Sequence, residues 1–349
     1  MPPLPPDLDR YSRQILFHGI GEDGQRRIRQ GRVLLCGCGA LGSAIADSLV
    51  RAGVGFVRLV DRDFVELSNL QRQVLFDEQD IADELPKAIA AARKLAKINS
   101  TVDLDPIVAD IDHTNILALT ADIDLILDGM DNFETRFLIN DAAMERRLPW
   151  IYGGCVGSHG QVMPIFPGET GCLRCLIGDV PGPGMSETCD TAGVIGPAVN
   201  VVAALQVVAA LKILAGRRDL IPPVLTIVDV WDGTLRQMSV ASLRERSDCP
   251  ACIHGKREWL SGTKGSQTTV LCGRNAVQVS PAEKHALALS DLAAKLAEAG
   301  AVSQNAFLLR FTPAGTDAQL TIFPDGRAIV KGTDDVTVAR SLYARYVGA

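Results

Sequence analysis

The sequence contains no block of basic residues and no excess of positive charge. Its 35 lysines and arginines are outnumbered by 41 aspartates and glutamates, which gives a formal net charge of −6 at pH 7. Proteins that bind nucleic acid carry clustered positive charge to meet the phosphate backbone. We therefore expect no nucleic-acid partner.

Long apolar runs free of polar residues are also missing. The most apolar stretch, residues 198–215, contains Asn200, Gln206 and Lys212, and a membrane span would have to bury these in lipid. The first residues are rich in proline and lack the basic-then-apolar order of a signal peptide. We expect a cytoplasmic protein that contacts no membrane, with residues 198–215 in a buried or interface helix.

What remains is the composition of a globular protein. The chain has 349 residues, of which 47% are hydrophobic and 22% charged, and it is long enough for a full α/β domain plus a smaller one. Nine cysteines without a secretion signal indicate a reducing compartment, in which thiols serve metal binding or chemistry.

Residues 32–61 have the pattern of a strand–turn–helix–strand unit. The expected elements are a strand at 33–36, a helix at 43–52 and a strand at 56–60. The turn is G-x-G-x-x-G, in which Gly37 permits the turn, Gly39 lets the backbone approach a phosphate and Gly42 lets the helix pack on the strand. Asp61 ends the second strand, where a carboxylate accepts hydrogen bonds from ribose. The alternative is a glycine turn that only reverses the chain.

The loop after Asp61 argues against a nicotinamide cofactor. It contains two acids, an asparagine, Arg72 and a glutamine, and Lys87 follows at the start of the next helix. Hydride transfer needs a flat nicotinamide slot, whereas a triphosphate needs cations, together with carboxylates for magnesium. Arg72 and Lys87 meet the second need, although either could be ordinary surface charge.

These residues resemble the ThiF/MoeB/HesA family, the bacterial relatives of ubiquitin-activating enzymes. The motifs are Asp61-Arg62-Asp63, Ser68-Asn69-Leu70-Gln71-Arg72-Gln73 and Pro86-Lys87, and the resemblance runs from about residue 10 to residue 252. It implies that the protein uses ATP and Mg²⁺ to adenylate the C-terminal glycine of a small ubiquitin-like sulfur carrier that ends in Gly-Gly. The ATP contacts that we expect are Gly37, Gly39, Ala40, Gly42, Asp61, Asp63, Asn69, Arg72, Gln73, Lys87 and Asp131.

The resemblance also implies a homodimer. The stretch Arg10-Tyr11-Ser12-Arg13-Gln14 matches an arm that, in the family, reaches across a dimer. Its second arginine, here Arg13, would contact the ATP phosphates of the neighbouring subunit. Taken alone, an arginine this close to the N-terminus is more often simply solvated.

Asp131 follows an expected strand at 124–127, and ligands of open α/β sheets bind at such strand ends. Local sequence leaves a second interpretation open, in which Asp131 or Asn132 caps the next helix, residues 133–147. The family has an essential aspartate here in a D-x-x-D-N motif. The resemblance therefore implies that Asp131 binds magnesium and is catalytic, with Asn132 free to cap the helix.

Two C-x-x-C pairs, Cys172/Cys175 and Cys249/Cys252, can supply the four thiolates of a structural zinc site. Their separation is far longer than in a zinc ribbon, so redox pairs or coincidence are alternatives. The family has the same pairs in the same order and binds structural zinc with them. His254 is expected to be a bystander.

Cys189 lies in a Gly- and Pro-rich loop, residues 179–196. A lone loop cysteine is inert unless its pKa is depressed. The resemblance implies that this loop crosses the adenylate site. In ThiF-like members the cysteine that corresponds to Cys189 forms a covalent adduct with the carrier, whereas in MoeB-like members it can be dispensable. A helix expected at 197–215 would bring its N-terminus close to that loop. We expect Cys155 and Cys272 to be small buried residues.

The overall expectation is a Rossmann-like mixed sheet with helices on both faces, stapled by zinc, plus a small C-terminal α+β domain. The domains are 1–254, a linker at 255–267, and 268–349. Other expected elements of the first domain are helices at 86–99 and 113–120 and strands at 102–108, 150–156, 161–166, 224–230 and 235–240.

In the C-terminal region we expect the order β-α-β-β-β-α. The strands are placed at 269–273, 307–311, 319–323 and 328–330, and the helices at 286–299 and 334–346. The region resembles the appended domain of longer bacterial ThiF-like proteins and has no rhodanese-like active-site loop, so we expect it to support carrier recognition or the dimer rather than to deliver sulfur.

The sequence thus predicts a nucleotidyltransferase for a ThiS-like carrier, with a cysteine desulfurase as a possible sulfur source. The same site would serve a MoaD-like carrier, or a ubiquitin-like protein for tRNA thiolation or conjugation. Two interpretations from other classes are an NAD-dependent oxidoreductase and a non-catalytic zinc-stapled binding module.

Overall fold

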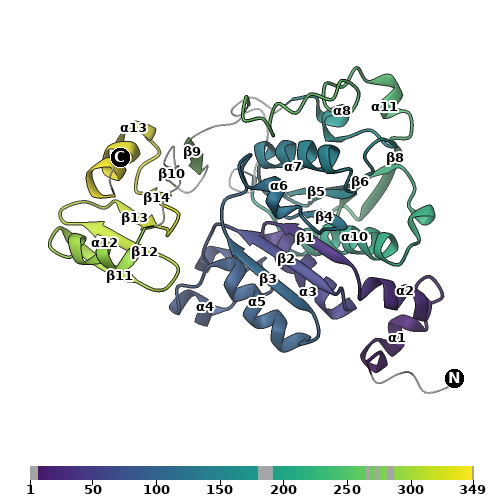
Figure 1. The fold of residues 1–349 in the computed structure, drawn as a ribbon, viewed down its shortest axis with the longest axis horizontal. Helices are drawn as coiled ribbons and strands as arrows, with labels where there is room; N and C mark the ends of the chain where they lie inside the picture. The colour runs from purple at the N-terminus through teal and green to yellow at the C-terminus, as the bar shows by residue number, and fades with distance from the viewer. Residues whose placement is uncertain (1–6, 180–191, 265–267, 272–274, 281–286, 348–349) are drawn as a thin grey trace. The chain divides into compact units, whose positions relative to one another are not determined.

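The computed structural model describes residues 7–179, 192–264, 268–271, 275–280 and 287–347. The chain divides into two compact units, Met1–Lys264 and Gly265–Ala349 (Figure 1). The division falls inside the predicted linker, residues 255–267.

Among the residues that the structure describes, an eight-stranded sheet organises the first unit. Its strands in chain order are β1 Arg32–Cys36, β2 Phe56–Asp61, β3 Asp103–Val108, β4 Leu125–Asp128, β5 Trp150–Val156, β6 His159–Ile165, β7 Val224–Asp229 and β8 Thr234–Ser239. The spatial order is β3-β2-β1-β4-β5-β6-β7-β8. The first five strands are parallel, and β6, β7 and β8 extend the sheet antiparallel, as expected for the mixed sheet.

Helices cover both faces of this sheet (Figure 1). The longer ones are α2 Gly21–Ile28, α3 Ala40–Ala52, α5 Lys87–Ile98, α7 Phe133–Arg146 and α10 Gly196–Leu214. The shorter ones are η1 Asp9–Tyr11, α1 Ser12–Ile15, η2 Leu67–Asn69, α4 Glu78–Ala82, α6 Ile116–Leu119, α8 Leu173–Ile177, η3 Arg218–Leu220 and α11 Leu243–Arg246. Helix α3 packs against α5 and α10, whereas α7 packs against α6 and α8.

Strand β1 is buried because it lies between parallel neighbours that are themselves covered by helices. Val33, Leu34, Leu35 and Cys36 have no solvent exposure, as the continuous apolar run predicts for a strand in a parallel sheet. Helix α3 begins at Ala40, three residues earlier than the predicted residue 43, because the turn closes at Gly39, which occupies the N-cap.

Two further expectations for this unit were wrong in detail. The predicted helix at 113–120 is only Ile116–Leu119, because the Asp112 side chain accepts the N–H of Thr114 and holds a turn there. Cys155 is half-buried rather than buried. It pairs in register with Gly160, which has no side chain to cover it.

Helix α10 is long and apolar enough to cross a membrane by length and composition, and half of its most apolar window is buried inside the protein. One such helix is weak evidence for a span, because core helices pass the same test. The burial agrees with the predicted buried or interface helix.

In its described part, the second unit has a six-stranded antiparallel sheet and two helices. Its elements are β9 Thr268–Leu271, β10 Ala276–Val279, α12 Leu289–Leu296, β11 Gly300–Gln304, β12 Leu309–Pro313, β13 Gln319–Ile322, β14 Ala328–Lys331 and α13 Val336–Tyr346. The strand order is β11-β12-β13-β14-β10-β9. A core that includes Leu309, Phe311 and Leu320 packs against residues of α12 and α13.

The predicted order of this unit missed two strands, β10 and β11. Strand β10 is four residues long and wholly buried, with no alternation to mark it. Strand β11, Gly-Ala-Val-Ser-Gln, has one β-branched residue and begins with Gly and Ala, which are depleted in strands. It lies at the edge of the sheet and is held there by its pairing with β12. Cys272 lies outside the described residues.

Candidate functional site

The glycine turn between β1 and α3 is packed on one side and open on the other. Gly37 has φ of +90° and Gly42 has no room for a side chain, since a Cβ there would lie 1.9 Å from the Gly37 carbonyl oxygen. A Cβ on Gly39 would meet no atom nearer than Gln73 Nε2, 3.9 Å away. The open side therefore forms a cradle above Gly39 and the first N–H groups of α3, as an approaching phosphate requires.

Asp61 closes this turn from the end of β2. One carboxylate oxygen accepts the N–H of Cys38 at 2.6 Å and the other accepts the N–H of Asp63 at 2.7 Å. Burial raises the pKa of Asp61 above its usual range, and the nearby Lys87 opposes that rise. Asp61 is thus held beside the glycine turn by two backbone groups.

Lys87 is buried at the first position of α5, with a side chain only 3% exposed. Its ammonium group lies 3.3 Å from Asp63 Oδ2, and its backbone N–H donates to the Asp63 carbonyl at 2.9 Å. A buried ammonium needs an anion nearby. Lys87 is therefore part of a charged group beneath the turn rather than ordinary surface charge.

The amides of the following loop differ in surroundings. The Asn69 side chain accepts the N–H of Glu66 at 3.2 Å and closes the turn of η2. Gln73 is 3% exposed, and its Oε1 has no hydrogen-bond partner in the described part of the chain. Because it lies beside Gly39, this orphaned oxygen fits a site that binds a polar ligand.

Arg72 is half-buried, and its guanidinium donates to the Ser68 carbonyl at 2.8 Å. The first residue of α10, Gly196, lies against it, since a Cβ there would be 3.7 Å from Arg72 Cα. The chain leading into α10 is therefore beside the predicted phosphate-binding loop. Cys189 itself lies outside the described residues.

Asp131 is exposed just beyond β4. Asn132 caps α7, because its side-chain oxygen accepts the Thr135 N–H at 2.9 Å. The Asn132 side-chain nitrogen donates to one oxygen of the Asp131 carboxylate at 3.3 Å. Asp131 lies within electrostatic range of Arg62. Arg62 also binds Asp110, with 3.1 Å between charged atoms, and sequence reasoning gave neither residue a role. An exposed carboxylate with Asp63 in the same neighbourhood is a chemically suitable donor for Mg²⁺.

Arg13 does not join this group within one chain. It lies exposed on α1, and it makes no hydrogen bond or ion pair among the residues that the structure describes. Its neighbours Leu16 and Phe17 are more than half exposed. The structure thus brings together the glycines, Asp61, Asp63, Gln73 and Lys87, and leaves Arg13 apart.

The four cysteines of the two C-x-x-C pairs converge on one point. Their sulfurs all lie within 4.8 Å of one another, with Cys172–Cys249 at 3.6 Å and Cys175–Cys252 at 3.3 Å. Four sulfurs bound tetrahedrally at about 2.3 Å from zinc would be about 3.8 Å apart. Hydrogen bonds from the neighbouring thiols lower the pKa of Cys249. His254 pairs instead with Asp248.

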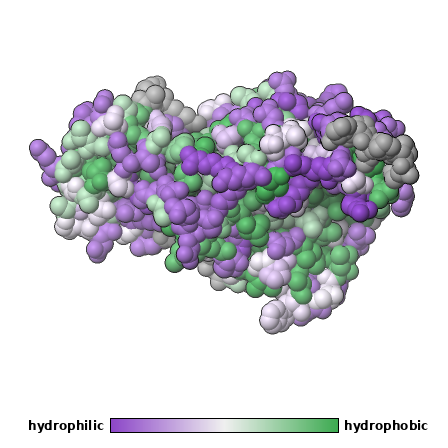
Figure 2. Space-filling view, turned by 90° about the horizontal axis from the view of Figure 1, so that it is seen from below, coloured by the Kyte–Doolittle hydropathy of each residue, from purple (hydrophilic) through white to green (hydrophobic). Residues whose placement is uncertain are grey.

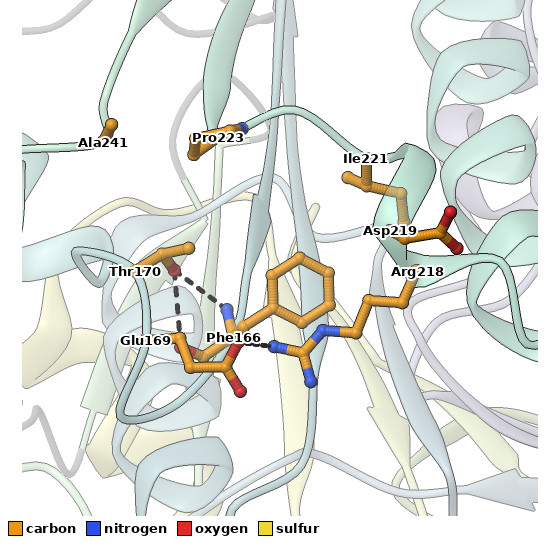
Figure 3. Close-up of a pocket in the computed structure, with 8 residues that line it drawn as sticks. All are labelled: Phe166, Glu169, Thr170, Arg218, Asp219, Ile221, Pro223 and Ala241. Carbon is orange, nitrogen blue, oxygen red and sulfur yellow. Dashed lines mark hydrogen bonds and ion pairs between the residues drawn. The ribbon is translucent and has the colours of Figure 1, made fainter.

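A separate hollow of about 460 Å³ lies at the opposite end of the sheet (Figure 3). Phe166 follows the carboxyl end of β6, and Pro223 precedes the amino end of β7. Because β6 runs antiparallel to β5, both residues lie at the edge where the parallel strands begin. Arg218 lies over the Phe166 ring and pairs with Glu169. Because the hollow lies at the end of the sheet opposite the glycine turn, it is not part of the candidate nucleotide site.

The fold and the site define a protein that binds a nucleotide at the carboxyl edge of a mixed α/β sheet, with a four-cysteine cluster beside that sheet. The chain belongs to the ThiF family, whose model matches residues 11–251.

Individual relatives agree with this assignment. Sulfur carrier protein ThiS adenylyltransferase of Bacillus subtilis is 44% identical over 340 residues, which cover 97% of this chain and 99% of that protein. The protein of the same name from Escherichia coli is 39% identical over 247 residues, or 70% of this chain and 95% of that protein. Among solved structures, Escherichia coli MccB with ATP is 26% identical, with a TM-score of 0.58 and coverage of 71% of this chain and 76% of that one.

Proposed function

We propose that this protein uses ATP to adenylate the C-terminal glycine of a ubiquitin-like sulfur carrier protein. The observation that carries the proposal is the charged glycine turn, where Asp61, Asp63, Lys87 and an orphaned Gln73 oxygen surround an open cradle. ThiF-family membership and the names of the relatives support the same reaction.

The chemistry needs no general base. The carrier's carboxylate is ionised at neutral pH, and one of its oxygens attacks the α-phosphorus while the bond to the β-phosphate oxygen breaks. The products are an acyl-adenylate and pyrophosphate. In this chain Asp61 binds the ribose, and Arg72, Lys87 and Arg13 of the partner subunit hold the phosphates and stabilise the charge of the transferring group. Because a carboxylate is a weak nucleophile, positioning supplies much of the rate.

Two metals belong to the proposal. Asp131 would hold Mg²⁺, which supplies charge neutralisation at the phosphates. The cluster of Cys172, Cys175, Cys249 and Cys252 would hold one Zn²⁺, and four thiolates leave no open position, so its role is structural.

The carrier that we favour is ThiS-like, for the thiazole of thiamine, because the Bacillus subtilis and Escherichia coli relatives are named for ThiS. A MoaD-like carrier or another ubiquitin-like protein is the alternative. Cys189 would form a covalent adduct with the carrier, and a cysteine desulfurase would supply the sulfur. The compartment is cytoplasmic.

A homodimer completes the proposed site. Helix α10 exposes Val208 and half-exposes Leu211 on one side, and it packs against α2, which in turn packs against α1. Directly after α1, Leu16 and Phe17 are exposed. Figure 2 shows hydrophobic residues gathered over part of the same unit, seen from below. An apolar surface of this kind fits a second copy of the chain, which would carry Arg13 to the neighbouring ATP.

The test is ATP–pyrophosphate exchange with purified ThiS-like and MoaD-like carriers, side by side. We expect exchange with the ThiS-like carrier and its loss when the carrier's last glycine is removed. Exchange with the MoaD-like carrier alone would move the protein to the alternative pathway. Absence of exchange with every ubiquitin-like carrier, in protein that binds ATP, would refute the proposal.

A further inference from the structure

A buried ion pair lies directly beneath the proposed magnesium carboxylate. Asp128, the last residue of β4, has no solvent exposure, and Arg136 of α7 is 6% exposed. Arg136 Nε lies 3.0 Å from Asp128 Oδ2. Breaking such a pair is costly, because the remaining charge is left buried and uncompensated. None of the roles described above uses either residue.

The pair holds the segment that carries Asp131 from both sides. Asp128 Oδ1 accepts the Met130 N–H at 2.8 Å, and a terminal nitrogen of Arg136 donates to the Met130 carbonyl at 2.5 Å. On the other side of Asp131, Asn132 is fixed as the cap of α7. Asp131 therefore lies between two anchored neighbours.

The same segment touches the glycine turn. The Gly129 N–H donates to the Cys36 carbonyl at 2.8 Å, and a Cβ on Gly37 would lie 2.7 Å from the Gly129 carbonyl oxygen. A shift of the segment by even a fraction of an ångström would change the distance between Asp131 and a phosphate bound at the turn. Metal ligands depend on such outer contacts for their orientation.

Only an arginine suits this position. Its planar fork reaches the Asp128 carboxylate together with two carbonyls, those of Met130 and Gly153, whereas a lysine ammonium is a point charge on a flexible stem. Gln206 of α10 donates to the Asp128 carbonyl at 3.2 Å and supports the pair from the other side of the sheet.

We propose that Arg136 is a positioning residue, which acts through the Met130 carbonyl and Asp128 to hold Asp131 at the distance from the glycine turn that Mg²⁺–ATP requires. The inference rests on the proposed function of Asp131. It predicts that replacing Arg136 weakens ATP binding in the presence of Mg²⁺. Without Mg²⁺, ATP affinity should depend on the glycine turn and Lys87 and should not change.

The experiment measures ATP affinity by calorimetry, with and without Mg²⁺, for the wild type, Arg136→Lys and Asp131→Asn. The matched control is Arg58→Lys, because Arg58 is also largely buried, pairs with Asp105 at 2.7 Å and donates to the Leu119 carbonyl at 2.8 Å, away from the site. Thermal unfolding is recorded for each protein. If Arg136→Lys does not fold, Asp128→Asn, which keeps the shape of the side chain, replaces it.

The gain in ATP affinity that Mg²⁺ gives the wild type should be about 10-fold to 100-fold smaller in Arg136→Lys. Asp131→Asn should show a similar reduction. The affinity of Arg136→Lys for ATP without Mg²⁺ should stay within about twofold of the wild-type value. Arg58→Lys should keep both affinities. Equal losses with and without Mg²⁺ would show that Arg136 is only structural, and a wild type whose ATP affinity ignores Mg²⁺ would equally overturn the inference. Neither result decides whether a carrier is adenylated, which pyrophosphate exchange tests separately.

Discussion

Two glycines of one turn, Gly39 and Gly42, meet opposite surroundings. A side chain at Gly42 would collide with backbone, at 1.9 Å from the Gly37 carbonyl oxygen, whereas one at Gly39 would meet only the end of Gln73, at 3.9 Å. One glycine therefore serves the packing of α3 on β1, and the other keeps the cradle open for a phosphate. The sequence motif predicts the same division of roles, because the position of each glycine in G-x-G-x-x-G differs.

Alanine at each position separates stability from binding. We expect Gly42→Ala to lower the free energy of unfolding by about 2 kcal/mol or more, because backbone must move. Gly39→Ala should change it by about 1 kcal/mol or less and yet weaken ATP binding at least as much as Gly42→Ala does. Urea unfolding and calorimetry with ATP measure the two quantities. A Gly39→Ala protein with wild-type ATP affinity would contradict the proposed cradle.

Helix α7 connects the two halves of the candidate site. Near its N-terminus Asn132 and Arg136 fix the Asp131 segment. At the middle of the helix the Asn140 side chain accepts the N–H of Leu173, which lies within the first cysteine pair. The next residue, Asp141, accepts the N–H of Trp259 at 3.0 Å. The helix thus ties the nucleotide edge of the sheet to the cysteine cluster.

Asp141 of this helix is expected to make the stability of the folded protein depend on pH. Burial raises the pKa of Asp141 to about 6, although hydrogen bonds from Trp259 and Leu260 oppose the rise. In the unfolded chain the pKa of an aspartate is near 4. Between about pH 4 and pH 6 the folded state therefore binds more protons at Asp141 than the unfolded state does. The stability that the protonated group contributes is therefore present below about pH 4 and is lost as the pH rises through about 6.

We expect Asp141→Asn, which keeps an acceptor oxygen but does not titrate, to remove the part of the pH dependence of stability that Asp141 causes. The free energy of unfolding of the wild type, measured relative to Asp141→Asn, should fall by up to about 3 kcal/mol between pH 4 and pH 6.5. Urea unfolding of both proteins at several pH values provides the test, and other titrating groups cancel in the difference. A difference that is flat across this range would show that Asp141 is not the group responsible.

Element positions in the first unit followed from local pattern, because apolar runs, glycines and caps specify them without distant contacts. The predicted strand at 150–156 is β5 Trp150–Val156, and Asn132 caps α7 as the residue type suggests. The local sequence pattern did not predict strands that depend on pairing with another strand. Strand β11, which pairs with β12, is an example. The contacts of Arg136 with Asp128 and Gly153, and of Arg62 with Asp110, form only when helix and strands pack together, so no spacing in the sequence indicates them.

At the scale of the whole molecule, the proposed site is incomplete in one chain. Arg13 is exposed and apart from the glycine turn, although the residues that would share its ligand are gathered there. A mixture of two inactive proteins, Arg13→Ala and Asp131→Ala, tests the exchange of Arg13 between subunits. In a mixed dimer one of the two sites has both residues intact.

We expect the mixture, after subunit exchange, to recover about a quarter of the wild-type pyrophosphate exchange, since half of the dimers are mixed and each has one intact site. Each variant alone should be inactive. Recovery should disappear when the same two substitutions are combined in one chain and mixed with either single variant. Failure to recover activity between folded, dimeric variants would place Arg13 outside its neighbour's site.

The cysteine cluster also has a consequence for how the chain assembles. Cys172 and Cys249 are 77 positions apart, and closing a flexible loop of that length costs about 4 kcal/mol of chain entropy. Each C-x-x-C pair alone offers an ion two sulfurs, and all four meet only after α10, β7 and β8 have folded between them. The metal we propose would therefore bind tightly only to chains whose loop has closed, so metal content would report the fraction of correctly assembled molecules.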